Sequence, residues 1–365
     1  MSVLMSEELK QLATAAHGLL QKAAGPTAFR AVRDAGGDGF SRDLWAQMVE
    51  LGWGGLAIPE VLGGFDMGPS AVVLVADALG AHLAAAPFVS TAVFGATALA
   101  AGDEAQADRL AQLAAGELVL GIPLDAGGGA PSLSAEPDGD GFRLFGTQRH
   151  LLDLPGADAA LLWARTGEGT TAFVVPAEAL RAQAEVTTLI DHRRAAAVTL
   201  EGVEVGPEHR VGAAGEGEAV LASALALGRA AAAAEMVGAA RAVFESTLDY
   251  MRDRKQFGAP IGSFQALQHR AAHLHTELTI AGAMVRKAAD AIASDQDAAR
   301  MVAAAKAKAG QVAVLAANEA IQLHGGVGVT DEYDVGMFVK RIRTLENTFG
   351  DTRRCRDLHA RCLGF

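Results

Sequence analysis

The chain has 365 residues, half of them hydrophobic, which is enough for roughly two to three domains with substantial cores. Its formal net charge is −12, so the surface as a whole repels phosphate backbones and we expect no nucleic-acid partner. Glu7 and Glu8 stand where an export signal would carry positive charge, and the apolar stretch 71–93 is interrupted by Asp77 and His82. We therefore expect a cytoplasmic protein without a membrane span.

The first part of the chain shows apolar residues at helical spacing up to about residue 113. The predicted helices are 9–20, 44–51, 71–83 and 88–101. A Gly/Pro-rich turn separates the second helix from the third, and its glycines permit backbone shapes that other residues resist. Residues 1–115 are therefore predicted to form an all-helical N-terminal domain.

The middle of the chain changes to short apolar or alternating runs separated by turn residues. The predicted strands are 118–123, 142–145, 159–164, 171–175, 185–189 and 196–200. The sequence Asp-Gly-Asp-Gly at 138–141 predicts a tight hairpin, because such turns need positive φ. Residues 116–213 are therefore predicted to form a small β-barrel or sandwich.

The last part of the chain returns to long, alanine-rich helical patterns. The predicted helices are 216–251, 264–294, 298–324, 332–344 and a last one that ends near 362. Cys355 and Cys362 lie two helical turns apart, about 10.5 Å, which is too far for a disulfide, so both should be free thiols. Residues 214–365 are predicted to form a helical bundle, and the whole chain an α+β multidomain protein.

Two segments of the last part have a specific pattern. Residues 250–265 read YMRDRKQFGAPIGSFQ and residues 321–328 read IQLHGGVG, and Gln322 lies 68 residues downstream of Arg254. Together they resemble the Arg-x-Gln-Phe-Gly and Gln-x-x-Gly-Gly-x-Gly elements of acyl-CoA dehydrogenases. The Leu-Gly-Trp at 51–53 and the Pro-Glu and Gly-Gly pairs between 59 and 64 extend the resemblance to the N-terminal domain. The resemblance implies an N-terminal helical domain, a middle β-domain and a C-terminal four-helix bundle.

The resemblance also implies FAD as cofactor, with this chain contacting the FAD that a neighbouring subunit binds. It assigns the pyrophosphate and adenosine contacts to Arg254, Gln256, Phe257 and Gln265, and the adenine end to Gln322, Gly325 and Gly326. The chemistry agrees with this assignment, because a guanidinium presents a planar pair of donors to phosphate oxygens and glycines expose backbone NH groups. No metal site is expected.

The catalytic base of the family is a carboxylate that removes the α-proton of an acyl thioester. The resemblance places Phe349 at one known base position and Gly228 at the other, and neither is an acid. The nearby acids Asp351, Glu346 and Glu235 could substitute. Asp351 is also a good helix N-cap, and Glu235 is expected to pair with a cation inside the bundle. Arg229, next to Gly228, is a candidate substrate-binding residue.

The flavin-facing segments of the β-domain depart from the family pattern as well. Residues 123–131 read PLDAGGGAP instead of the family's Thr-Glu-x-Gly-x-Gly-Ser-Asp loop. In the family's Trp-Ile-Thr-Asn segment, His150 replaces the aromatic residue and Leu152 replaces the hydroxyl residue. We expect His150 to be an exposed residue without a catalytic role. The adenosine-contacting half of the pattern is kept, whereas the flavin and base half is lost.

The resemblance therefore implies a subunit of an FAD-dependent acyl-CoA dehydrogenase that completes the FAD site of a homologous catalytic subunit. Its partners would be that subunit, in a heterotetramer with two copies of each chain, an acyl-CoA substrate and an electron-transfer flavoprotein. Two alternatives stay open. One is a self-sufficient homotetramer with a relocated base such as Asp351 or Glu235, and the other is a non-enzymatic scaffold.

Overall fold

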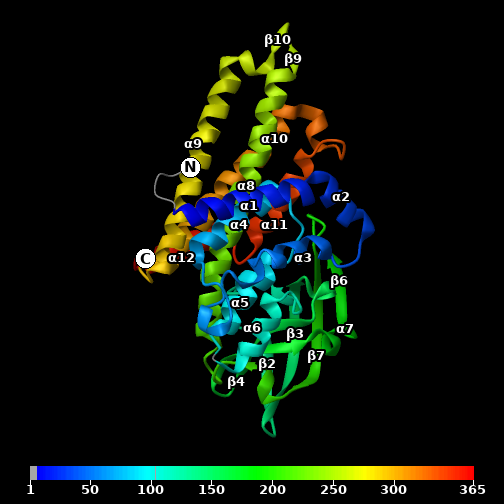
Figure 1. The fold of residues 1–365 in the computed structure, drawn as a ribbon, viewed down its shortest axis with the longest axis vertical. Helices are drawn as coiled ribbons and strands as arrows, with labels where there is room; N and C mark the ends of the chain where they lie inside the picture. The colour runs from blue at the N-terminus through cyan, green and yellow to red at the C-terminus, as the bar shows by residue number, and fades with distance from the viewer. Residues whose placement is uncertain (1–5, 103) are drawn as a thin grey trace. The chain divides into compact units, whose positions relative to one another are not determined.

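A computed structural model describes residues 6–102 and 104–365 (Figure 1). Helices come first, a β-sheet follows, and long helices complete the chain, which confirms the α+β fold class. The chain forms two compact units. One comprises the described residues of Met1–Phe29 together with Val73–Ala84 and Arg229–Phe365, and the other comprises Arg30–Val72 and Ala85–Gly228. The division passes through three helices, and the domain boundaries at 115 and 213 stay predictions.

The first part of the chain consists of short helices. They are α1 (Glu7–Ala23), α2 (Pro26–Ala35), α3 (Arg42–Glu50), η1 (Trp53–Gly55), η2 (Glu60–Leu62), α4 (Gly68–Ala81), η3 (Phe88–Gly95), α5 (Ala96–Ala100), η4 (Glu104–Gln106) and α6 (Ala107–Ala114). Serine caps begin α1 and α3, where Ser6 and Ser41 accept from backbone NH groups. The predicted helix 88–101 begins as a π-helix, η3, before α5 continues it. The short helices α2 and α6 were not predicted individually.

The strands of the middle part form one mixed sheet. They are β1 (Leu120–Pro123), β2 (Leu133–Asp138), β3 (Gly141–Leu152), β4 (Ala159–Thr166), β5 (Gly169–Pro176), β6 (Ala184–Thr188), β7 (Arg194–Val205) and β8 (Arg210–Val211), with the short helices η5 (Leu154–Gly156), α7 (Ala177–Arg181) and η6 (Pro207–His209) between them. Their order is β6-β7-β3-β1-β4-β5-β8, with β2 beside β3 and β4. The predicted hairpin joins β2 to β3, where Asp138 pairs with Gly141 and Gly139 has φ +59°. Strand β2 was not predicted.

The core of the sheet is formed by buried apolar residues of its long strands. Leu144, Leu162 and Phe173 are fully buried and belong to one hydrophobic cluster. On the turn between β6 and β7, His192 has φ +64°, a conformation that favours glycine. Strands β4 and β5 are buried at consecutive positions, so both of their faces are covered, whereas the edge strand β6 is mostly exposed.

The last part of the chain consists of long helices and a small hairpin. They are α8 (Gly217–Asp253), β9 (Lys255–Gln256), β10 (Ala259–Pro260), η7 (Ile261–Ser263), α9 (Gln265–Ala293), α10 (Ala298–His324), η8 (Gly325–Val329), α11 (Val335–Asn347) and α12 (Thr352–Cys362). Helices α9 and α10 pack side by side, and the hairpin lies at the end of α8 (Figure 1). Cys355 is buried, Cys362 is exposed, and both are free, as predicted.

Helix α8 has an apolar composition that the sequence analysis did not single out. Among the described residues, α8 is the one helix that is long and apolar enough to cross a membrane, and the mean hydropathy of its most apolar window is 1.5. However, 72% of that window is buried within the protein. Core helices of folded domains commonly have this composition, so it is weak grounds for a membrane span.

Candidate functional site

The first element of the candidate site is the hairpin that follows α8. Strands β9 and β10 pair antiparallel, and the turn between them has Phe257 at φ +53° and Gly258 at φ +81°. Two consecutive positive φ angles are typical of tight hairpin turns. The Phe257 side chain is 93% exposed, and Arg254 and Gln256 are exposed as well. The hairpin therefore presents these three side chains outward from the chain that carries them.

The second element is the end of α10. Gln322 lies in the last turn, and Gly325 ends the helix with φ +67° and ψ −146°, a conformation essentially restricted to glycine. Gln322, Gly325 and Gly326 are at least partly exposed, and a Cβ added at either glycine would meet no other atom within 4 Å. This helix end is therefore open to a partner or ligand.

Ring contacts join the two elements. The Tyr250 ring, in the last turn of α8, stacks on the His324 ring of α10 with centroids 4.3 Å apart. The Tyr250 hydroxyl donates to the His324 carbonyl oxygen at 3.3 Å. The structure therefore brings the predicted Arg254 and Gln322 elements to the same end of the bundle.

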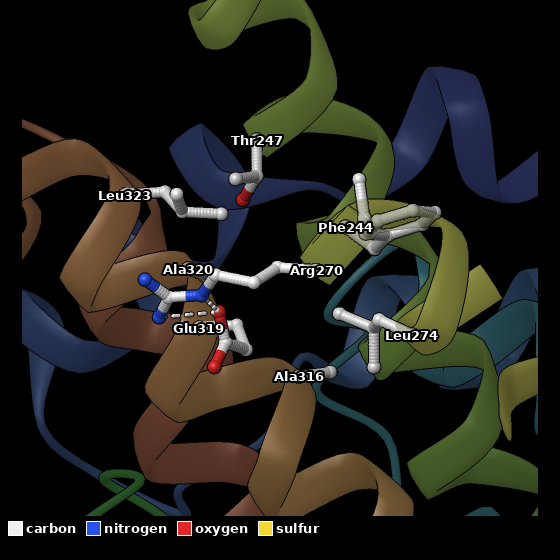
Figure 2. Close-up of a pocket in the computed structure, with 9 residues that line it drawn as sticks. Phe244, Thr247, Arg270, Leu274, Ala316, Glu319, Ala320 and Leu323 are labelled. Carbon is white, nitrogen blue, oxygen red and sulfur yellow. Dashed lines mark hydrogen bonds and ion pairs between the residues drawn. The ribbon is translucent and has the colours of Figure 1, made fainter. Parts of the chain in front are cut away.

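A narrow crevice lies between α8, α9 and α10 (Figure 2). Its polar contact is the ion pair of Arg270 with Glu319, whose atoms lie 2.7 Å apart, and Phe244, Leu274 and Leu323 are among the apolar residues around it. The crevice is too narrow to admit a water molecule. It therefore does not offer a substrate pocket.

The turn after α11 contains Phe349, the residue that the resemblance places at the first family base position. Phe349 is fully buried and has φ +60°, which is unusual for a bulky residue. The Arg229 Nε donates to the Phe349 carbonyl oxygen at 2.8 Å. Burial lowers the pKa of the Arg229 guanidinium. The structure thus shows Arg229 holding the backbone of this turn, and its role toward substrate stays a prediction.

Lys306 holds the same turn and was missed by the sequence analysis. Its Nζ is buried and donates to the carbonyl oxygens of Leu345 at 2.9 Å, Glu346 at 3.0 Å and Gly350 at 3.3 Å. The last carbonyls of a helix lack partners within the helix, and here a lysine from α10 satisfies those of α11. The only sequence signal was a lysine within an apolar helical pattern.

Lys306 should make stability depend on pH in the alkaline range. Burial lowers its pKa to about 8, whereas the unfolded chain keeps the usual value near 10.5. Between these values the unfolded state binds more protons, so stability should rise with pH by up to about 3 kcal/mol relative to Lys306→Met. Chemical denaturation of both proteins from pH 7.5 to 10.5 measures this difference. The nearby Cys355 thiol, whose pKa burial raises, should be replaced by alanine in both proteins. A constant difference would contradict the prediction.

Both the sequence and the fold match known proteins. The family model for the acyl-CoA dehydrogenase N-terminal domain matches residues 6–117, and the model for the acyl-CoA dehydrogenase C-terminal domain matches residues 215–363. Acyl-CoA dehydrogenase FadE27 from Mycobacterium tuberculosis is 32% identical over 326 residues, which cover 85% of each chain.

The chain belongs to the acyl-CoA dehydrogenase family.

Two solved structures extend the comparison to the fold. A chain of the ChsE4-ChsE5 complex from Mycobacterium tuberculosis is 28% identical, with a TM-score of 0.89 over 100% of this chain and 99% of that chain. A chain of a variant of the Tcur3481-Tcur3483 steroid acyl-CoA dehydrogenase is also 28% identical, with a TM-score of 0.88 over 98% of each chain. FAD is the cofactor of this family, and the predicted domain order is the one these proteins share.

The hairpin and the end of α10 fit the outer half of FAD. Within residues 6–102 and 104–365, the Arg254 guanidinium has no hydrogen-bond or ion-pair partner, so its donors are available to a phosphate. The glycines leave an open surface, and Gln265 is exposed at the start of α9. The same described residues contain no group of three or more His, Cys, Asp or Glu side chains that could hold a metal ion.

The flavin-facing segment of the β-domain does not fit the isoalloxazine half. His150 is exposed with φ +53°, and Leu152 is 5% exposed and pairs with Ile122 and Ala195 in the sheet. A buried leucine has no hydroxyl or amide to donate to a ring edge. Leu152 therefore supplies no side-chain hydrogen bond at the position where the family pattern has a hydroxyl.

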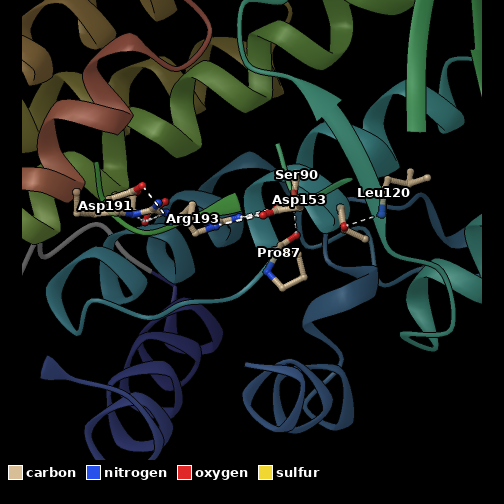
Figure 3. Close-up of polar contacts among 9 residues, drawn as sticks. Pro87, Ser90, Leu120, Asp153, Asp191 and Arg193 are labelled. Atoms are coloured by element: carbon tan, nitrogen blue, oxygen red, sulfur yellow. Dashed lines mark hydrogen bonds and ion pairs between the residues drawn. The ribbon is translucent and has the colours of Figure 1, made fainter. Parts of the chain in front are cut away.

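Asp153, the next residue, is part of a buried polar network that the sequence analysis missed (Figure 3). It is fully buried with φ +63° and accepts from Arg193 at 2.7 Å and from the Ser90 hydroxyl at 2.6 Å. Burial of both charges is tolerated because they pair and are hydrogen-bonded. The network links the π-helix η3 to the turn between β6 and β7, and thereby fixes the segment that carries His150 and Leu152.

The three acids considered as relocated bases all have structural partners. Glu235 is 2% exposed and accepts from the Arg341 Nε at 2.8 Å, which confirms the expected ion pair. Asp351 caps α12 by accepting from the Arg354 backbone NH at 2.7 Å, as expected. Glu346 accepts from the Thr352 backbone NH at 2.9 Å. Each carboxylate therefore has a structural partner, and a catalytic role for any of them stays a prediction.

Glu235→Gln should reduce stability strongly. Removing one member of a buried ion pair leaves the charge of Arg341 without its carboxylate, at a cost of about 3 kcal/mol or more. Urea denaturation measures the loss, and Glu245→Gln, at an exposed position on the same helix, should change stability by less than about 0.5 kcal/mol. Loss of turnover with unchanged stability would instead identify Glu235 as a relocated base.

Proposed function

We propose that this chain is the cofactor-completing subunit of an FAD-dependent acyl-CoA dehydrogenase. In this proposal the chain assembles with a homologous catalytic subunit, with two copies of each. Arg254, Gln256, Phe257, Gln265, Gln322, Gly325 and Gly326 contact the FAD whose flavin ring lies in the partner. The partner supplies the catalytic carboxylate.

The observation that carries the proposal is the contrast between the two halves of the family pattern. Arg254 is exposed on the hairpin and has no side-chain partner within residues 6–102 and 104–365, so its donors are available to a phosphate. At the same time Phe349, which the resemblance assigns to the base position, is fully buried and carries no acid. A chain that does not bind cofactor would have no chemical need of the exposed Arg254. A self-sufficient enzyme, in turn, would need a catalytic base.

The side chains of this subunit would act by binding and orientation. The Arg254 guanidinium would neutralise and orient the pyrophosphate, Phe257 would pack against the adenosine, and the Gln322 amide would hydrogen-bond at the adenine end. When bound, FAD accepts the hydride that leaves the β-carbon of the acyl thioester. The α-proton would pass to the partner's carboxylate, since Phe349 and Gly228 cannot accept it.

The proposed substrate is an acyl-CoA, with a steroid-derived or fatty acyl group. The similarity to a structure described as a steroid acyl-CoA dehydrogenase favours a bulky acyl group. The proposed electron acceptor is an electron-transfer flavoprotein, as in the family that the motifs indicate. We also propose a cytoplasmic location.

The homotetramer with a relocated base is the second candidate. Its strongest acids are Asp351 and Glu235, and the helix cap and ion pair of these residues argue against it. The non-enzymatic scaffold is disfavoured because the chain keeps both the Arg254 and the Gln322 elements of the family pattern. Both alternatives can be tested together with the main proposal.

The experiment pairs this chain with a homologous subunit that carries a carboxylate at a family base position. Native mass spectrometry should show two copies of each chain, and the complex should desaturate an acyl-CoA. Replacing the partner's catalytic carboxylate by its amide should remove all turnover, whereas Asp351→Asn in this chain should preserve turnover. Residual turnover with the partner variant would assign a base to this chain, and the proposal would fail.

A further inference from the structure

Three aromatic rings meet between the two proposed FAD-contacting elements. Tyr250 stacks on His324 at 4.3 Å with an interplanar angle of 25°. Tyr333, in the segment before α11, lies edge-on to both rings, at 5.8 Å from His324 and 6.1 Å from Tyr250. Ring pairs at these distances and angles attract each other beyond their buried area. We name these three residues the ring clamp.

His324 is fixed in both orientation and protonation. Its Nδ1 lies 2.8 Å from the Ala320 carbonyl oxygen, and a carbonyl only accepts, so Nδ1 carries the proton. The side chain is 5% exposed, and burial lowers the pKa of its imidazole. The neutral ring is therefore locked against the helix that carries it. The Tyr250 hydroxyl additionally binds the His324 carbonyl group, next to Gly325.

Neither FAD-contacting element can fix its own position. Arg254 stands one turn beyond Tyr250, at the start of a hairpin whose turn is fully outside the bundle. Gln322 and Gly325 flank His324 where the helix ends in a glycine-rich 3-10 segment, η8. The ring clamp spans from one to the other.

We propose that Tyr250, His324 and Tyr333 are positioning residues that hold the Arg254 and Gln322 elements at the separation FAD requires. The inference rests on the proposed function, because it deepens the account of the same site. The rings touch no part of the cofactor in this account. They act by limiting how far the hairpin and the end of α10 can move apart.

The test is FAD titration of the deflavinated assembly that co-purifies with this chain. His324→Ala should weaken FAD binding by about tenfold, because the ring contacts are lost and the Arg254 hairpin and the end of α10 can move more freely. His324→Phe should bind within about threefold of the wild type, because the stack survives without the imidazole. Rescue by phenylalanine shows that the ring, and not a hydrogen bond or charge, carries the effect.

His275→Ala provides a matched control. His275 is an exposed residue of α9 whose ring lies 6.4 Å from Phe244, away from the glycine-rich end. Its removal should leave FAD affinity unchanged. If His324→Ala does not fold, Tyr333→Ala removes a more exposed ring of the clamp and should weaken FAD binding about threefold.

The outcomes separate this inference from the proposed function. Loss of FAD in Arg254→Ala with unchanged affinity in His324→Ala and Tyr333→Ala would overturn the ring clamp and leave the completing subunit in place. Unchanged affinity in all three would overturn both. Equal weakening in His324→Ala and His324→Phe would also overturn the clamp, because it would assign the effect to the imidazole itself.

Discussion

Arg254→Ala is expected to remove most of the FAD from the assembled complex at micromolar cofactor concentration. A charge-assisted hydrogen bond contributes about 1.5 to 3 kcal/mol, and a guanidinium can make two to a pyrophosphate. FAD affinity should therefore fall by at least about tenfold, and turnover should fall with cofactor occupancy. Flavin absorbance after gel filtration measures the retained FAD.

Arg252→Ala is the matched control for this experiment. Arg252 lies in the last turn of α8 and is similarly exposed, but it pairs with Asp249 on the same helix at 2.5 Å. The substitution removes one positive charge from the same end of the bundle without touching the hairpin. Its FAD content should equal that of the wild type. Full FAD content in Arg254→Ala would contradict the completing-subunit account.

Gly238→Ala is expected to destabilise the unit that contains Gly238 and Asp77 by about 3 kcal/mol. A Cβ at Gly238 would overlap the carbonyl oxygen of Asp77 on α4, and one at Gly80 would overlap the carbonyl oxygen of Glu235. The two helix backbones cross at these glycines, so an added methyl group must push them apart. Separation would also disturb the Arg241–Asp77 ion pair and the packing of alanines at the crossing.

Gly282→Ala tests the same substitution without the close approach. A Cβ at Gly282 on α9 would lie 3.6 Å from the Arg286 guanidinium and 3.8 Å from Val237, which are ordinary contacts. Alanine has the better helix propensity, so this change should stabilise by about 0.5 to 1 kcal/mol. Thermal unfolding of both variants should give shifts of opposite sign. Equal shifts would show that the crossing tolerates a methyl group.

The long helices and the hairpin at 138–141 could be predicted because their signals are local. Helix α10 begins at Ala298 and ends at His324, as the periodicity and the following glycines indicate. The helix cap at Asp351 and the buried ion pair of Glu235 were also predicted. A carboxylate just before a helix caps its free NH groups, and a carboxylate inside a bundle needs a cation or a hydrogen-bond donor. Strand β2 was missed because its sequence, LSAEPD, has little β-propensity and is held by its neighbours.

The contacts that hold the candidate site could not be predicted because they join residues far apart in the sequence. Lys306 meets the carbonyls of Leu345 and Gly350, and Arg193 meets Asp153, only after the chain has folded. The stack of Tyr250 on His324 is of the same kind. A lysine or histidine in an apolar pattern marks such residues as candidates, but does not indicate their partners.

The motif positions, by contrast, could be located from the sequence and are brought together by the fold. Arg254 and Gln322 lie at one end of the bundle through the Tyr250 and His324 contact. Their contact with FAD stays a prediction. It also stays a prediction that the partner subunit supplies the catalytic base in place of Phe349 and Gly228. The comparisons establish the family and the fold, and the division of labour between subunits is the central proposal.

The measurement that tests this proposal most directly is the ratio of FAD to protein, for this chain purified alone and then together with its catalytic partner. The account predicts no FAD on the isolated chain and about one FAD per pair of unlike chains in the complex, because affinity requires both halves of the site. One FAD per chain in the isolated protein would contradict the account and show that this chain forms a complete flavin site by itself.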